Sequence, residues 1–148
     1  MRHAAHAFWI VPALALAARG QPAAFKPYPG AAVDQKATKE AKELAEGEVT
    51  IYTTRDSFEK VLAFYKPLGK EYRMPAPDGP VPLRSGGTLK EAYFILDGAP
   101  DIVESRAWFK IQRPYAGRPK AAFNPEARFF EDQYDDVRDV TAIVLVRQ

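Results

Sequence analysis

VTIYTTRDSFEKVLAFY, residues 49–65, predicts a strand that runs directly into a helix, and the rest of the fold is expected to form around this unit. Residues 49–54 are all β-branched or aromatic and alternate at the two-residue period of a strand. Asp56 can then cap a helix, and Glu59 three residues later completes a capping box. We expect the helix to kink or stop near Lys66, because Pro67 lacks an amide and cannot continue a regular helix. Its apolar stripe recurs at helical spacing and comprises Phe58, Val61, Leu62 and Tyr65.

Three further apolar runs predict strands, at residues 92–96, 107–113 and 140–146. In the second run, Phe109 and Ile111 share one face, and the side chains between them share the other. The third run, VTAIVLV, is the most continuous apolar stretch, which predicts a central strand buried on both faces or nearly so. A second helix is predicted from an Asp34 cap to Glu46, with Gly47 as its stop.

These elements predict an α+β fold, with a mostly antiparallel four-stranded sheet and two main helices packed on one face. The later strands are too close in sequence for helical crossovers, which favours antiparallel pairing. The chain has 148 residues, of which 47% are hydrophobic and 27% charged, the balance of a globular protein. We therefore expect residues 33–148 to form a single domain.

The first residues have the pattern of a signal peptide. Arg2 precedes an apolar run at residues 8–18, and Ala15-Leu16-Ala17 matches a small-residue cleavage site. We expect residues 1–17 to be removed and residues 18–32 to form an extended leader, which predicts an exported protein, periplasmic or secreted. An ordinary N-terminal tail or an apolar first helix is the alternative. The apolar run is shorter than the roughly 20 residues that span a bilayer, so no membrane span is expected in the mature form.

Composition restricts the chemistry that the mature chain can perform. His3 and His6 are the only histidines, and the chain has no cysteine. Without them, zinc sites, Ser–His or Cys–His nucleophiles and disulfides are excluded from residues 18–148. We expect no cofactor and no metal. The net charge of +2, from 21 basic and 19 acidic residues, does not favour nucleic acid as a partner.

Four stretches resemble a group of small exported bacterial proteins, with which no activity is associated. These are VTIYTTRDSFEKVLAFYK (49–66), KEAYFILDG (90–98), WFKIQRPY (108–115) and DVRDVTAIVLV (136–146). The group shares a YPGA leader, here residues 28–31, a YTT-x-D-x-FEKV-x-x-FY core and a DVT-rich last strand. The resemblance covers roughly residues 26–148 and implies export and an α+β fold. It transfers no site residues.

A cluster of cations beside aromatic rings is the candidate binding site. It comprises Trp108, Lys110, Arg113, Tyr115, Arg118 and Lys120, with Phe123 close by in sequence. Such a set can bind an anionic or carbohydrate ligand through charge, stacking and cation–π contact. In an exported protein the partners would be an envelope component, a small ligand or another protein. A solvated loop whose aromatic rings pack on the sheet edge is the competing interpretation.

Carboxylates offer an alternative function. Asp56, Glu59, Asp97 and Glu104 are candidates for a histidine-independent hydrolase. The acidic run at residues 131–139 does not have the spacing of a calcium loop and is expected to be a charged loop. A structural accessory subunit, pairing through a sheet edge or aromatic face, is a third possibility. The sequence favours a non-catalytic binding module and leaves the question of an enzyme open.

Overall fold

The computed structural model describes residues 24–75, 79–122 and 124–148. The predicted signal peptide at residues 1–17 and Phe123 lie outside the described residues. Within those ranges, every helix is too short or too polar to cross a bilayer.

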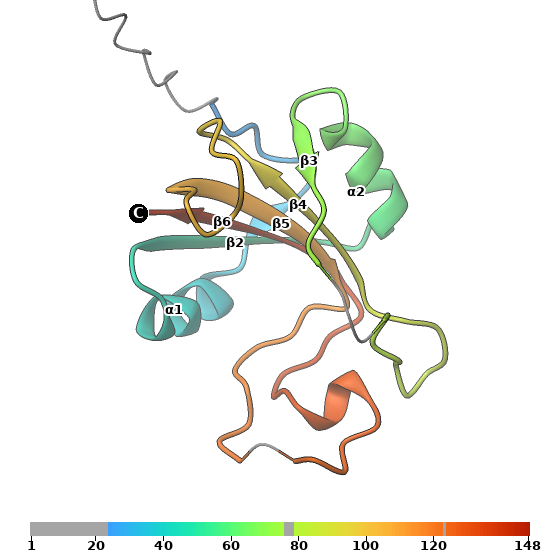
Figure 1. The fold of residues 1–148 in the computed structure, drawn as a ribbon. Helices are drawn as coiled ribbons and strands as arrows, with labels where there is room; N and C mark the ends of the chain where they lie inside the picture. The colour runs from blue at the N-terminus through green and yellow to red at the C-terminus, as the bar shows by residue number, and fades with distance from the viewer. Residues whose placement is uncertain (1–23, 76–78, 123) are drawn as a thin grey trace, which may run out of the picture.

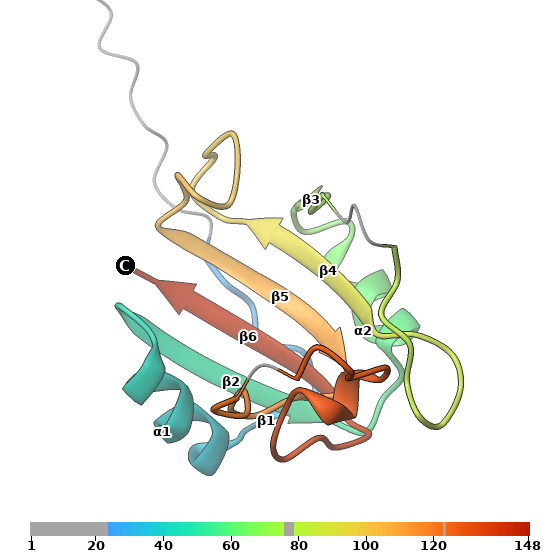
Figure 2. The same ribbon diagram turned by 60° about the horizontal axis from the view of Figure 1, so that its bottom comes forward.

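A single antiparallel sheet of six strands forms the body of the protein, which confirms the α+β class. The strands are β1 (Ala32–Val33), β2 (Glu48–Thr54), β3 (Lys70–Tyr72), β4 (Lys90–Ile95), β5 (Ala107–Arg113) and β6 (Thr141–Arg147). Their spatial order is β1-β2-β6-β5-β4-β3 (Figure 2). The four predicted strands are β2, β4, β5 and β6. The expected count of four was wrong because β1 and β3 are edge strands of two and three residues, too short to show a period.

Two α-helices and one short 3₁₀ helix accompany the sheet: α1 (Gln35–Leu44), α2 (Phe58–Tyr65) and η1 (Phe130–Asp132). Asp34 caps α1 as predicted, since its carboxylate accepts from the Ala37 amide at 2.9 Å. The predicted cap of α2 was wrong by one residue, because Ser57 accepts from the Lys60 amide. Asp56 accepts instead from the Tyr28 hydroxyl, at 2.7 Å, and so ties the leader to the start of α2.

The helices lie on opposite faces of the sheet, so the prediction that both pack on one face was wrong (Figure 1). The α1 face carries Val49 and Ile51 of β2 and the β5 side chains Trp108, Lys110 and Gln112. The opposite α2 face is covered by α2, and its core comprises Phe58, Val61, Tyr65, Ala92, Phe94, Phe109, Ile111, Ile143 and Leu145. Both faces of β6 are apolar, and each needs its own cover.

The leader completes the α2 face. Phe25 packs against Tyr52, Tyr65 and Phe109, with ring centroids 5.3–6.0 Å apart. The Tyr65 hydroxyl donates to the Lys26 carbonyl at 2.9 Å. The α2 face is therefore covered by helix α2 and by the extended leader. On the other face, α1 is the only α-helix that the structure describes, and it covers part of the sheet.

Candidate functional site

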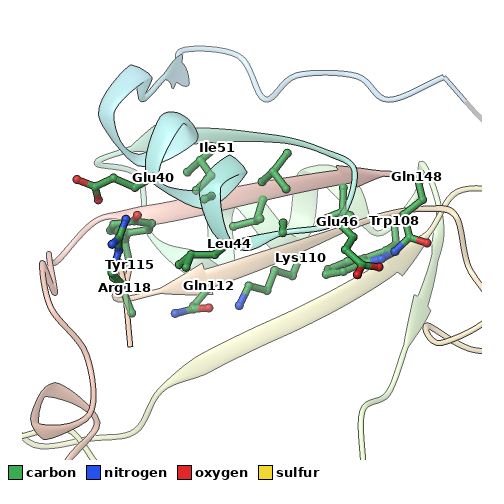
Figure 3. Close-up of a pocket in the computed structure, with 17 residues that line it drawn as sticks. Glu40, Leu44, Glu46, Ile51, Trp108, Lys110, Gln112, Tyr115, Arg118 and Gln148 are labelled. Carbon is green, nitrogen blue, oxygen red and sulfur yellow. The ribbon is translucent and has the colours of Figure 1, made fainter. Parts of the chain in front are cut away.

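A cavity of about 400 Å³ lies between α1 and the α1 face of the sheet (Figure 3). Its walls come from the C-terminal half of α1, from β2, β6 and β5, and from residues 115–118, which follow β5. Most of the lining side chains are apolar, among them Leu44, Val49, Ile51, Val144 and Val146. This volume is within the range of small-molecule sites.

Small residues on α1 create the cavity. Ala37 is fully buried near the start of the helix, where the Thr38 hydroxyl accepts from the Ile51 amide at 3.0 Å and fixes the helix to β2. Farther along, Ala41 and the C-cap residue Ala45 line the cavity, but a methyl group is too short to fill the space between the helix and the sheet. The helix is thus held tightly at one end and stands off the sheet at the other.

Two ion pairs join α1 to the long segment between β5 and β6. Arg138 Nη2 lies 2.8 Å from Asp34 Oδ2 at the start of the helix. Arg118 Nη2 lies 2.8 Å from Glu43 Oε2 near its end. These pairs hold residues 115–118 against α1 and close one end of the pocket, where Figure 3 shows Tyr115 and Arg118.

Lys110 is the cation in the middle of the site. It projects from the centre of β5, a strand with neighbours on both sides, and only 25% of its side chain is exposed. Burial lowers the pKa of Lys110, because the apolar surroundings disfavour the ammonium ion. The carboxylate of Glu91, 3.8 Å away, acts in the opposite direction. An anionic group bound beside Lys110 would offset this desolvation cost, because an opposite charge favours the ammonium ion.

Aromatic side chains stand at the two ends of the pocket. Trp108 lies beside Tyr93 of β4, with ring centroids 6.2 Å apart, and Figure 3 places it at the opposite end from Tyr115. Tyr115 is buried, and the Arg138 guanidinium lies 4.6 Å from its ring centroid. Burial raises the pKa of Tyr115, so its hydroxyl stays neutral at physiological pH.

Four of the six predicted site residues meet in this pocket: Trp108, Lys110, Tyr115 and Arg118. Arg113 and Lys120 do not line it. Arg113 projects on the α2 face, where its guanidinium donates to the Asp56 carbonyl at 3.0 Å and to the Asp139 carboxylate at 3.0 Å. Lys120 is exposed and reaches the Glu131 carbonyl at 3.5 Å. We therefore assign Arg113 a structural role and leave Lys120 out of the site.

Sequence reasoning missed the α1 side of the pocket. Leu44, Glu40 and Glu46 line it, as does Gln148 at the end of the chain. The alternation of β5 indicated which β5 residues would share a face, but not that a helix would stand opposite them. The spacing of small residues on α1 was the available signal, since a helix whose apolar side consists mostly of alanine methyl groups leaves room beneath it.

Three of the four carboxylates considered for a hydrolase have structural partners. Asp56 accepts from Tyr28, Glu59 pairs with Lys90, and Asp97 accepts from the Ser105 hydroxyl at 2.9 Å. Asp97 also accepts from the main-chain amide of Arg106, the residue before β5. None of these three, all described in the structure, lines the pocket.

The acidic run before β6 makes separate contacts with basic residues. Asp132 pairs with Arg84, Asp136 with Arg138, and Asp139 with Arg113. Within residues 24–75, 79–122 and 124–148, no three acidic, histidine or cysteine side chains are grouped to hold a metal ion.

Comparisons with protein-family models, with curated proteins and with solved structures found no match to this chain. The likeness to small exported bacterial proteins stays an expectation from the sequence. The pocket is therefore the feature of the molecule that points to a function.

Proposed function

We propose that this protein is an exported, non-catalytic module that binds a small amphipathic ligand in the α1 pocket. The ligand's apolar body lies between α1 and the sheet, and its anionic group faces Lys110. The observation that carries the proposal is a lysine near the centre of a sheet face, at the wall of an otherwise mainly apolar cavity.

The apolar walls supply the affinity. Burying apolar surface contributes roughly 25 cal/mol per Å², and a ligand between Leu44, Val144 and Val146 would bury surface on both sides. Trp108 offers a large ring at one end for stacking. Binding would also cover Leu44, which is 59% exposed in the free protein.

Lys110 supplies the selectivity for charge. Its ammonium is partly desolvated and its only described ionic partner, Glu91, is at 3.8 Å, beyond hydrogen-bonding distance. An anionic ligand group at normal hydrogen-bond distance would form a charge-assisted bond that this arrangement leaves open. A neutral ligand of the same shape would leave the ammonium without such a partner.

Two fluorescent probes separate these contributions. The sulfonate 1-anilinonaphthalene-8-sulfonate and the neutral N-phenyl-1-naphthylamine share one apolar body. Titration of the full-length chain should show tighter binding of the anion. Lys110→Met should lower the affinity for the sulfonate by about tenfold and leave the affinity for the neutral probe nearly unchanged. Lys66→Met, which removes the same charge at an exposed position on the other side of the sheet, is the matched control.

A variant that fills the cavity tests whether the probes bind there. Ala41→Phe fills the space beneath α1 and should abolish binding of both probes, whereas Ala63→Phe, on the exposed side of α2, should not. Circular dichroism checks that each variant folds. Full probe binding by folded Ala41→Phe, or an equal loss of both probes in Lys110→Met, would overturn the proposal.

A further inference from the structure

Gln112 is a buried residue at the wall of the pocket. Among the described residues, the nitrogen of its side-chain amide makes a hydrogen bond and the oxygen does not. The residue is only 5% exposed, and its Nε2 donates to the Pro114 carbonyl at 3.2 Å. A carbonyl oxygen accepts and cannot donate, so the nitrogen of the amide must face Pro114. The amide oxygen therefore faces the other way, and no described residue donates a hydrogen bond to it.

Lys110 lies two residues before Gln112 on the same face of β5, about 6.6 Å away along the strand. Figure 3 shows both side chains extending from β5 in the same direction, with the amide oxygen on the side nearer Lys110. The ammonium makes no hydrogen bond to a described residue either. The pocket thus presents an unused donor and an unused acceptor as neighbours.

We propose that the pocket selects a carboxylate with an N–H one carbon away, as in an N-acyl amino acid. The carboxylate accepts from Lys110, and the N–H donates to the Gln112 oxygen. The order of residues along β5 then places the acyl group on the Tyr115 side of Gln112. This inference rests on the proposed function, because it names the class of amphipathic anion that the same pocket takes.

A simple fatty acid does not satisfy both groups. Its carboxylate can pair with Lys110, but its methylenes would cover the Gln112 oxygen and leave a desolvated acceptor without a donor. Sites with a buried polar group of this kind discriminate against ligands that lack its partner. The pocket should therefore prefer an N-acyl amino acid over an acid of equal size with no N–H.

Dansylglycine and dansylsarcosine test this choice. Both carry the same fluorescent body and a carboxylate, and the N-methyl group of sarcosine removes the N–H. The full-length chain should bind dansylglycine about five- to tenfold more tightly. In Gln112→Met that ratio should fall to about one, with dansylsarcosine binding little changed. Lys110→Met should lower the affinity for both ligands and leave the ratio of the two affinities unchanged.

The outcomes distinguish this inference from the proposed function. Equal binding of both ligands by the native chain, or an unchanged ratio in folded Gln112→Met, overturns the inference while the pocket stands as a site for anions. Failure of both dansyl ligands and of 1-anilinonaphthalene-8-sulfonate to bind overturns the two proposals together. Near-ultraviolet circular dichroism confirms that Gln112→Met is folded, since it loses the bond to Pro114.

Discussion

Lys110 Nζ lies 3.8 Å from Glu91 Oε1, across the boundary between β5 and β4, at the edge of the α1 pocket. The separation is within ionic range but longer than a hydrogen bond. Glu91 Oε1 also accepts from the Tyr93 hydroxyl at 3.3 Å, so it is shared between two partners. The pair is therefore weak, and an anionic ligand would compete with Glu91 for the same ammonium.

Glu91→Gln should increase the affinity for 1-anilinonaphthalene-8-sulfonate. The substitution removes a carboxylate that repels the ligand and partly neutralises Lys110, an effect of about 1 kcal/mol, or about fivefold in the dissociation constant. Fluorescence titration measures it. Glu126→Gln makes the same charge change at an exposed position outside the pocket and should have no effect. Weaker binding by Glu91→Gln would contradict the placement of the anion.

Binding of the sulfonate should depend on pH in the alkaline range. Burial lowers the pKa of Lys110, so the ammonium loses its charge at a lower pH than an ordinary lysine, and affinity falls there. Glu91 raises that pKa, so in Glu91→Gln the fall should begin at a lower pH. Burial raises the pKa of Tyr93, which keeps this neighbour neutral. The neutral naphthylamine probe should show no such fall between pH 7 and about 10, which makes it the control.

Lys110→Met should stabilise the free protein while it weakens binding. A lowered pKa in the folded state means that folding opposes the charge, so the lysine costs stability below its folded pKa. That cost disappears as the pH rises toward the ordinary lysine value of 10.5. At neutral pH we expect a gain of about 0.5–2 kcal/mol in urea unfolding, as at other functional sites. The gain should shrink at alkaline pH; a variant less stable than the native chain would argue against this role.

How far the sequence predicted the fold depends on how long each element is. The four strands of five or more residues had a visible period, whereas β1 and β3 owe their existence to pairing with β2 and β4. The run VTAIVLV in β6 already implied cover on both faces, and this conflicted with helices on one face. Periodicity assigns a residue to a face of its own strand, but which face a helix then covers depends on the path of the chain.

The candidate site was predicted only in part, because alternation groups residues of one strand and does not show which other element lies opposite them. Trp108 and Lys110 alternate with buried residues on β5, so the sequence could group them. Arg113 belongs to the opposite alternation and was included only because it is close in sequence. The contribution of α1 depends on a tertiary contact between elements about 70 residues apart, which no local pattern encodes.

Ser57→Ala should destabilise the protein by about 1 kcal/mol, the usual cost of losing an N-cap. The Ser57 hydroxyl accepts from the Lys60 amide at 3.2 Å, and alanine would leave that amide without a partner in the protein. Thermal and urea unfolding measure the loss. Ser85→Ala, in the exposed loop before β4, should stay within about 0.5 kcal/mol of the native chain. A similar result for both variants would mean that Ser57 is not the effective cap.

Arg113→Met should destabilise the protein by about 1–3 kcal/mol without changing probe affinity in the folded state. Its guanidinium donates to the Asp56 carbonyl, to the Thr141 hydroxyl and to Asp139, and so joins the start of α2 to the start of β6. Thr141 is fully buried and donates to the same Asp56 carbonyl at 2.6 Å, and this bond would remain, so the loss is that of the guanidinium's own hydrogen bonds. Lys120→Met removes an exposed cation of the same sequence cluster and should change neither stability nor binding. Urea unfolding and sulfonate titration on both variants separate the two roles. Weaker binding by Lys120→Met, or by folded Arg113→Met, would place the anion outside the α1 pocket.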